Sequence, residues 1–166
     1  VTDLDTHLAA RALRCLTAEL RRREEVLRRV GAADLVQARR CGDPAGHLPR
    51  LVVVIDEFAT LASDLPGFVD ALVGLAQRGR SLGMHLVLAT QRPAGVVSDA
   101  VRANISVRIA LRTAHGDESR DVLDDPVAAH LPRAHPGRAV MRVGSGAPVV
   151  LQSAHCGTEQ STTPPV

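Results

Sequence analysis

Apolar residues recur every three or four positions near the start of the chain, which predicts an amphipathic helix. This periodic region covers Asp3–Val30, with Asp5 or Thr6 in position to cap its first turn and Gly31 in position to end it. Residues 32–40 repeat the pattern over a shorter length. We therefore expect one long helix followed by a short one.

Continuous aliphatic runs replace the helical period further along the chain. Leu51–Ile55 is such a run, and Met84–Thr90 is another. Runs of this kind predict strands buried on both faces, so His85 is expected to be an interior histidine. Val107–Leu111 reads as a third strand. Between the first two strands we expect a helix over Ser63–Leu82, closed by a glycine.

The last third of the chain predicts shorter elements. Asp99–Asn104 and Ser119–Leu131 have helical character, and Pro126 interrupts the second of these. Arg138–Val143 and Pro148–Gln152 are expected to pair as a β-hairpin around a glycine-rich turn. Strands that alternate with helices indicate an α/β fold, with a mostly parallel sheet, flanking helices and a C-terminal β-hairpin.

The length of 166 residues is typical of one domain. We assign that domain to residues 1–153, with a loop at 41–49 and a flexible polar tail at 154–166. The sequence has no apolar run of about 18 residues that could span a membrane and no secretory leader. Its three cysteines are an odd number at wide spacing, which favours a reducing, cytoplasmic environment.

The composition excludes several kinds of chemistry. All 20 residues counted as Lys+Arg are arginine, so a P-loop lysine or a Schiff base cannot come from this sequence. The net charge of +2 gives too weak a field to attract DNA or a membrane by itself. Trp and Tyr are absent and there are two Phe, which excludes base stacking on aromatic side chains.

Polar residues follow both aliphatic strands at their carboxyl ends. Asp56 and Glu57 come after the first strand, and Thr90 and Gln91 end the second. If these strands are neighbours, all four residues lie in one crevice, where α/β folds bind ligands. An aliphatic strand that ends in two acids is a Walker B pattern, in which the first acid holds Mg²⁺ through water and the second polarises the attacking water. The alternatives are that the acids cap the next helix and that Gln91 caps a turn.

Five segments, in order, resemble the FtsK/SpoIIIE ATPases, and their wording is most similar to the EccC-like proteins of type VII secretion. The resemblance covers roughly residues 6–153. The segments are LVVVIDEFATL (51–61), LAQRGRSLGMHLVLATQRP (75–93), VRANISVRIALR (101–112), ESRDVLDD (118–125) and PGRAVMRVG (136–144).

This resemblance implies a RecA-like P-loop NTPase core that assembles into a ring, a hexamer by the family pattern, with ATP and Mg²⁺ bound between subunits. By position, Asp56 and Glu57 match the Walker B pair, Gln91 matches the strand-end sensor and Thr90 lies beside the nucleotide. Arg80 matches an arginine finger, although a solvent-facing arginine at a helix end is the alternative. Weaker candidates for phosphate or interface contact are Arg78, Arg102 and Arg108.

The family's Walker A loop belongs ahead of the first helix, and this sequence starts after that position. We therefore expect part of a P-loop core, with a sheet edge or cavity left open where the first strand of the family would lie. The isolated chain is expected to be marginally stable and to hydrolyse no ATP, because the loop that holds the phosphates is not in it.

The function implied is that of a motor ATPase that moves a polymer, either a secreted protein or double-stranded DNA. The low net charge favours protein. The expected partners are copies of the chain or other ATPase subunits in a ring, and contact with a membrane is expected only through segments outside this sequence. The alternative is a non-catalytic ring or scaffold subunit that no longer turns over nucleotide.

Overall fold

A computed structural model describes residues 6–40, 48–65 and 67–154. The predicted cap at Asp5, most of the predicted loop (41–47) and the tail from 155 onward lie outside the described residues. The chain divides into two compact units, Val1–Ser106 and Val107–Val166, and each is described by itself. The assignment of 1–153 to one domain stays a prediction.

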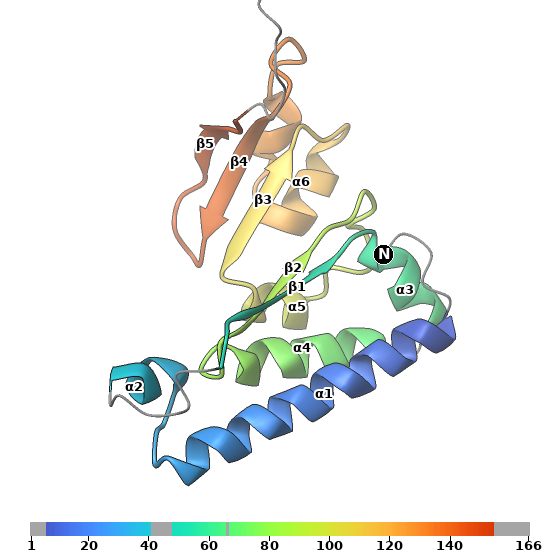
Figure 1. The fold of residues 1–166 in the computed structure, drawn as a ribbon. Coiled ribbons are helices and arrows are strands. Elements are labelled where there is room, and N and C mark those ends of the chain that lie inside the picture. The colour runs from blue at the N-terminus through green and yellow to red at the C-terminus, as the bar shows by residue number, and fades with distance from the viewer. Residues whose placement is uncertain (1–5, 41–47, 66, 155–166) are drawn as a thin grey trace, which may run out of the picture. The chain divides into compact units, whose positions relative to one another are not determined.

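The first unit combines a pair of parallel strands with helices that cover one side of it (Figure 1). Strand β1 pairs with β2 in register, with Leu51 opposite Met84 and Ile55 opposite Leu88. Helices α1 and α4 lie side by side, and α4 also contacts β2. The elements are α1 (Thr6–Arg29), α2 (Leu35–Arg40), β1 (Leu51–Ile55), α3 (Phe58–Asp64), α4 (Phe68–Gly79), β2 (Met84–Leu88) and α5 (Asp99–Asn104).

The long first helix ends where the sequence predicts. Gly31 has a φ of +67°, the left-handed conformation that terminates helices. The N–H of Ala32 then donates to the carbonyl of Leu27 at 3.0 Å, which satisfies a carbonyl that the helix itself leaves open. The chain therefore turns sharply at this point towards α2.

The predicted single helix over Ser63–Leu82 is wrong. Helix α3 begins directly after Glu57 and ends at Asp64, and α4 is a separate helix from Phe68 to Gly79. Gly67 lies between them with a φ of +77°, which a continuous right-handed helix cannot accommodate. Two short helices therefore replace one long one, and the first of them starts at the candidate acids.

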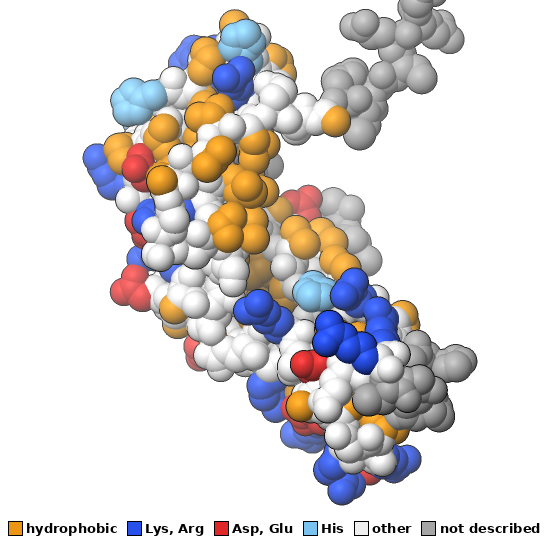
Figure 2. All heavy atoms as spheres, turned by 90° about the vertical axis from the view of Figure 1, so that its left-hand side faces the viewer, with side chains coloured by type: hydrophobic (Ala, Val, Ile, Leu, Met, Phe, Trp, Pro, Cys, Tyr) orange, Lys and Arg blue, Asp and Glu red, His pale blue; other side chains and the backbone are white. Residues whose placement is uncertain are grey.

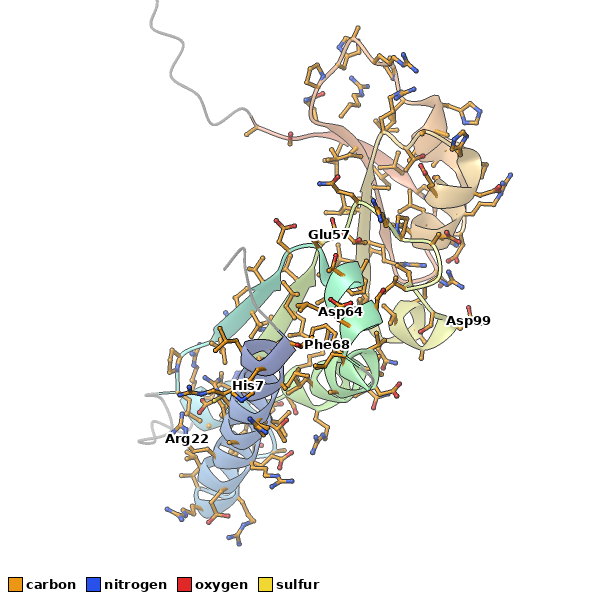
Figure 3. The ribbon with its side chains drawn as sticks, turned by 90° about the vertical axis from the view of Figure 1, so that its right-hand side faces the viewer. His7, Arg22, Glu57, Asp64, Phe68 and Asp99 are labelled. Atoms are coloured by element: carbon orange, nitrogen blue, oxygen red, sulfur yellow. The ribbon has the colours of Figure 1, made fainter. Side chains whose placement is uncertain are left out.

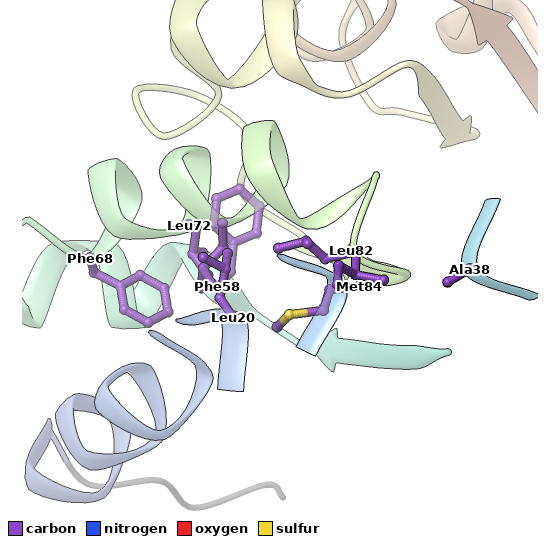
Figure 4. Packing of buried hydrophobic residues seen from close by; sticks show 9 residues of the cluster. Leu20, Ala38, Phe58, Phe68, Leu72, Leu82 and Met84 are labelled. Atoms are coloured by element: carbon purple, nitrogen blue, oxygen red, sulfur yellow. The ribbon is translucent and has the colours of Figure 1, made fainter. Parts of the chain in front are cut away.

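The core of the first unit lies between the helices and the inward side of the strands (Figure 4). Leu20 of α1 is fully buried, and Phe58 at the start of α3 packs into the same cluster. Because burial of such side chains is the main favourable term in folding, this cluster fixes where α3 begins. Its buried members are Leu20, Leu27, Ala38, Phe58, Phe68, Leu72, Leu75, Leu82 and Met84.

The prediction that both strands are buried on both faces is wrong. Val52 and Val54 of β1 are 56% and 65% exposed, and Val87 of β2 is 49% exposed. His85, predicted to be interior, is also exposed. The reason is that the described helices cover only one face of the pair, and β1 and β2 pair only with each other among the described residues. Apolar side chains are accordingly visible at the surface in Figure 2.

The second unit is a three-stranded antiparallel sheet covered on one face. Strand β3 (Val107–Leu111) pairs with β4 (Arg138–Val143), and β4 pairs with β5 (Val149–Gln152), so the predicted C-terminal hairpin is confirmed. Helix α6 (Gly116–Leu123) and the 3₁₀ helix η2 (Pro126–His130) supply the cover. The predicted break at Pro126 is therefore present.

The α/β class is confirmed, with one difference in topology. Val107–Leu111 is an antiparallel strand beside the C-terminal hairpin. Its alternation of exposed and covered residues is typical of a sheet with one open face, whereas the strands β1 and β2 are parallel. In the part of the chain that the structure describes, no helix is both long and apolar enough to cross a bilayer.

Candidate functional site

The candidate site lies at the carboxyl ends of β1 and β2, where backbone hydrogen bonds between the two segments continue past the ends of the strands. The N–H of Ala89 donates to the carbonyl of Ile55 at 2.9 Å, and the N–H of Phe58 donates to the carbonyl of Ala89 at 3.0 Å. These two hydrogen bonds hold the segment after β1 against the segment after β2. The predicted neighbourhood of the two strand ends is therefore confirmed.

Both carboxylate oxygens of Glu57 are held by the segment that follows β2. The hydroxyl of Thr90 donates to Oε1 at 2.8 Å, and the backbone N–H of Gln91 donates to Oε2 at 3.1 Å. The Thr90 hydroxyl also accepts a hydrogen bond of 3.0 Å from the N–H of Arg92, which fixes its orientation. Figure 3 shows Glu57 at the point where β1 passes into α3.

These contacts favour the ionised form of the Glu57 carboxyl. The hydrogen bond from Thr90 lowers the pKa of the Glu57 carboxyl, the N–H of Gln91 lowers it further, and the nearby charge of Arg92 adds to the effect. Partial loss of solvation acts in the opposite direction and is smaller than the first two causes. Glu57 is a carboxylate at neutral pH, as an ordinary glutamate is, and these contacts keep it ionised to lower pH.

The backbone of Glu57 is strained. Its φ and ψ are 50° and 48°, the left-handed conformation that non-glycine residues seldom adopt. Asp124 is the other non-glycine residue with positive φ in the described part of the chain. Such a conformation costs on the order of 1 kcal/mol, and strain of this kind is concentrated at functional sites. Here it directs the Glu57 carboxylate back across the strand ends.

Asp56 lies beside Glu57 but is exposed. Its Oδ1 accepts the N–H of Glu57 at 3.0 Å. The described residues contain no group of three or more histidine, cysteine, aspartate or glutamate side chains that could bind a metal by themselves. One exposed carboxylate at a strand end fits Mg²⁺ bound through water, because Mg²⁺ keeps several waters and takes few protein ligands.

The other predicted site residues are placed differently. Gln91 reaches Glu57 through its backbone N–H, and its side chain makes no hydrogen bond to another described residue. Arg80 follows α4 at the amino ends of the strands, so it lies at the opposite end of the sheet from Glu57. Five paired residues at about 3.3 Å each separate the two ends by roughly 15 Å. Arg80 is therefore not part of the cluster at Glu57.

The three weaker arginine candidates have acidic partners nearby in the chain fold. Arg78 lies 3.8 Å from Glu24, and Arg102 pairs with Asp99. Arg108 donates to Asp124 at 2.7 Å within the second unit. These ion pairs account for the position of each guanidinium without a ligand.

Sequence reasoning missed the direct bond between Thr90 and Glu57. The signal is the strand register, because Ile55 opposite Leu88 continues to Glu57 opposite Thr90. The register of this pair could not be read from the sequence, because both strands are continuous aliphatic runs without alternation and no tight turn joins them.

Comparison with known proteins shows the family of the chain. The family model described as the FtsK/SpoIIIE family matches residues 2–95, which is more than half of the chain. The chain belongs to the FtsK/SpoIIIE family. The matched region includes the whole cluster around Glu57, Thr90 and Gln91.

Proteins of type VII secretion systems are among the similar proteins. The type VII secretion system protein EssC of Staphylococcus aureus is 38% identical over 148 residues, which is 87% of this chain and 10% of EssC. The chain therefore spans about a tenth of the length of the curated relatives it matches.

Solved structures of similar proteins share the fold. The cytoplasmic domain of the type VII secretion ATPase EccC of Thermomonospora curvata is 38% identical with a TM-score of 0.79, over 89% of this chain and 18% of that one. The pCW3 conjugation coupling protein TcpA, solved with ATPγS, is 27% identical with a TM-score of 0.77, over 89% of this chain and 44% of that one. The predicted P-loop ATPase type of fold is therefore confirmed.

Proposed function

We propose that this chain supplies the Walker B side of the ATP site in a motor ATPase of the type VII secretion kind. The observation that carries the proposal is the Glu57 carboxylate, held at both oxygens by Thr90 and Gln91 at the carboxyl ends of adjacent parallel strands. The family match, and the similarity to TcpA solved with ATPγS, also support the proposal.

Each residue of the site has a role in this proposal. Glu57 orients and polarises the water that attacks the terminal phosphate, and the hydrogen bonds that fix its carboxylate suit that task. Thr90 positions the Glu57 carboxylate and lies beside the nucleotide. Gln91, exposed at the same strand end, senses the terminal phosphate through its side chain. Asp56 holds Mg²⁺ through water, and the bound Mg²⁺ neutralises charge on the phosphates.

Arg80 acts on another subunit in this proposal. It lies at the far end of the sheet from Glu57 and therefore cannot serve the nucleotide that Glu57 of the same chain faces. In a ring of copies or related ATPase subunits, each nucleotide would lie between the Glu57 end of one subunit and the Arg80 end of the next. Both residues would then contact a nucleotide. An arginine finger that stabilises the transition state is worth about 10³–10⁵ in rate.

We propose a protein substrate in preference to double-stranded DNA. The 38% identity to S. aureus EssC and to the cytoplasmic domain of T. curvata EccC, against 27% to TcpA, and the net charge of +2 both favour it. The proposed location is the cytoplasmic side of the membrane, since the matched EccC structure is of a cytoplasmic domain. A gel-shift titration with duplex DNA separates the substrates, because DNA affinity that falls steeply with salt is expected only of a DNA motor.

Hydrolysis is best tested in a chimera, since the phosphate-holding loop must come from elsewhere. Residues 6–153 replace the matching segment of the T. curvata ATPase, and phosphate release is compared between this chimera and its Glu57→Gln variant. We expect the Mg²⁺-dependent rate of hydrolysis at the site that contains this segment to be about 100-fold or more lower in the variant than in the chimera. A similar affinity for ATPγS in both proteins checks that the variant is folded. Equal rates in the two proteins would refute the proposal.

A second candidate is a non-catalytic ring subunit, which would need only the Arg80 end of the sheet, away from Glu57. In that case the chimera binds ATPγS and assembles, the Glu57→Gln variant behaves like its parent, and the Arg80→Gln variant still slows hydrolysis at the neighbouring site.

A further inference from the structure

A pocket of about 470 Å³ lies at the amino ends of β1 and β2, at the end of the sheet away from Glu57. Three arginines from three different segments line it: Arg39 from α2, Arg50 just before β1 and Arg80 just after α4. His85 of β2 also faces this pocket. Figure 2 shows basic side chains gathered beside a histidine and one acidic side chain on this face.

The walls of the pocket are tied together by backbone hydrogen bonds. The N–H of Leu35 donates to the carbonyl of Ser81 at 2.9 Å, which attaches α2 to the turn before β2. The N–H of Leu51 donates to the carbonyl of Gly83 at 2.9 Å, which attaches the start of β1 to the same turn. These hydrogen bonds fix the walls of the pocket relative to one another, so the pocket is formed without a ligand.

Two features position Arg39 at the pocket. Arg39 donates from Nη2 to the carbonyl of Leu48 at 3.1 Å, so its guanidinium is oriented. Gly83 has a φ of +72°, and a Cβ there would collide with the side chain of Leu35. Only glycine at this position lets α2, with Arg39, approach the end of β2.

The pocket carries an excess of positive charge. Asp34 is the one acidic residue that lines it, and its Oδ1 already accepts the N–H of Gln37 at 2.7 Å. Among the described residues, Arg50 and Arg80 make no ion pair, whereas several arginines of α1 pair with glutamates. Guanidinium groups that line one pocket favour phosphate as a ligand, because phosphate oxygens accept paired hydrogen bonds from a guanidinium.

We propose that Arg39 and Arg50, together with Arg80, form a phosphate-binding subsite that receives the terminal phosphates of a nucleotide held by a second copy. The first part of this inference, that the pocket binds phosphate, stands by itself. The second part, that the phosphate belongs to a nucleotide of a second copy, rests on the proposed function. The roughly 15 Å between the pocket and Glu57 excludes a nucleotide shared by both within one copy. The subsite thus gives Arg80 two supporting cations, which the sequence motifs do not indicate.

The first experiment tests the subsite on this chain alone, with pyrophosphate as the probe. Isothermal titration in low salt is expected to give saturable 1:1 binding, weakened about 5- to 10-fold by each of Arg39→Gln, Arg50→Gln and Arg80→Gln. Arg21→Gln, an exposed arginine of α1, is the matched control and is expected to stay within about twofold of the parent. Circular dichroism shows whether each variant is folded. No saturable binding by the parent, or equal binding by all variants, would overturn the subsite.

The second experiment tests the source of the phosphate in the chimera described above. Copies with Arg39→Gln and Arg50→Gln are mixed with copies carrying Glu57→Gln. We expect hydrolysis to recover on mixing, because some interfaces then combine an intact arginine pocket with an intact Glu57. Pyrophosphate binding without recovery would mean that the pocket takes a free phosphate compound and would overturn the second-copy source. An effect of the arginine variants with none from Glu57→Gln would instead reject the proposed function.

Discussion

The Thr90 hydroxyl donates a 2.8 Å hydrogen bond to Oε1 of Glu57 across the ends of two parallel strands. The two residues are 33 positions apart in the chain, and the register of β1 against β2 brings them opposite each other. The hydroxyl must be the donor, because a carboxylate can only accept, and its oxygen also accepts the N–H of Arg92. The orientation of the Glu57 carboxylate and the lowering of its pKa therefore both depend on a side chain that follows the next strand.

Replacing Thr90 with valine tests this dependence, because valine keeps the shape and removes the hydroxyl. In Thr90→Val the pKa of Glu57 is expected to rise towards its ordinary range, since the largest cause of its depression is gone. Carboxyl carbon shifts followed by NMR during an acid titration measure this directly. In the chimera the same variant should slow hydrolysis by about 10-fold while ATPγS affinity changes little.

Thr90→Ser is the matched control for the valine variant. Serine restores the donor, so the titration of Glu57 and the rate of hydrolysis should return close to those of the parent. If serine and valine behave alike, the hydroxyl does not position Glu57.

The arginine-rich end of α1 gives a pH-dependent prediction. Glu19 accepts hydrogen bonds from Arg22 and from Arg23, with Nε–Oε distances of 2.7 Å for each. The hydrogen bond from Arg22, followed by that from Arg23, lowers the pKa of Glu19 to about 2, against a partial loss of solvation. Arg23 is 2% exposed and also donates to the carbonyl of Leu82 at 2.9 Å.

A carboxyl whose pKa is lower in the folded than in the unfolded state stabilises the fold above its unfolded pKa. This contribution is lost as the pH falls from about 4.5 towards 2. We expect the loss to reach about 1–2 kcal/mol after allowance for solvent screening. Urea titrations of the parent and of Glu19→Gln at several pH values measure it, and the two stability curves should converge in acid. Curves that stay parallel would contradict the expectation.

Glu25→Gln is the control for Glu19→Gln. Glu25 accepts hydrogen bonds from Arg28 and Arg29, which also lower its pKa, but all three side chains are exposed to solvent. Surface pairs of this kind contribute little and are screened by salt. The difference between the two variants therefore isolates the effect of the buried Arg23.

Local patterns in the sequence predict local structure well in this chain. Residues close together in the sequence determine three of its features: the helical period of α1, the left-handed Gly31 after it and the turn of the hairpin at Gly144. The acids after β1 and the polar residues after β2 are equally local, and so the site could be located without coordinates. What each side chain bonds to depends on the register of β1 against β2, which two continuous aliphatic runs without a connecting tight turn do not set.

The burial of β1 illustrates what sequence patterns cannot supply. Five consecutive aliphatic residues predict a strand covered on both sides, yet Val52 and Val54 point away from the helices. An aliphatic sequence shows that both faces of a strand favour burial. Whether they are buried depends on which other elements pack against the strand. The split between α3 and α4 is similar, because it depends on the backbone at Gly67 and on the burial of Phe58.

Gly83 is predicted to be essential for the arrangement of α2. An alanine there would have to adopt a φ of +72°, and its Cβ would collide with the Leu35 side chain. Gly83→Ala is expected to lower the free energy of unfolding by about 2–4 kcal/mol, through backbone strain and forced movement of α2. Gly31→Ala is the control: its φ of +67° is similar, but nothing lies within 4 Å of the added Cβ, so only about 1 kcal/mol is expected. Equal losses would show that Leu35 yields without cost.

The open face of β1 gives the last prediction. Val54 is 65% exposed on β1, whereas Val140 of β4 is fully buried in the second unit. Val→Thr keeps the shape and the preference for strands but adds a hydroxyl, which is costly only where water is excluded. Thermal unfolding should therefore show that Val54→Thr changes stability by less than about 0.5 kcal/mol, whereas Val140→Thr lowers it by about 1–3 kcal/mol. A loss of similar size at Val54 would mean that this face is covered in solution, by a second copy if the loss depends on protein concentration.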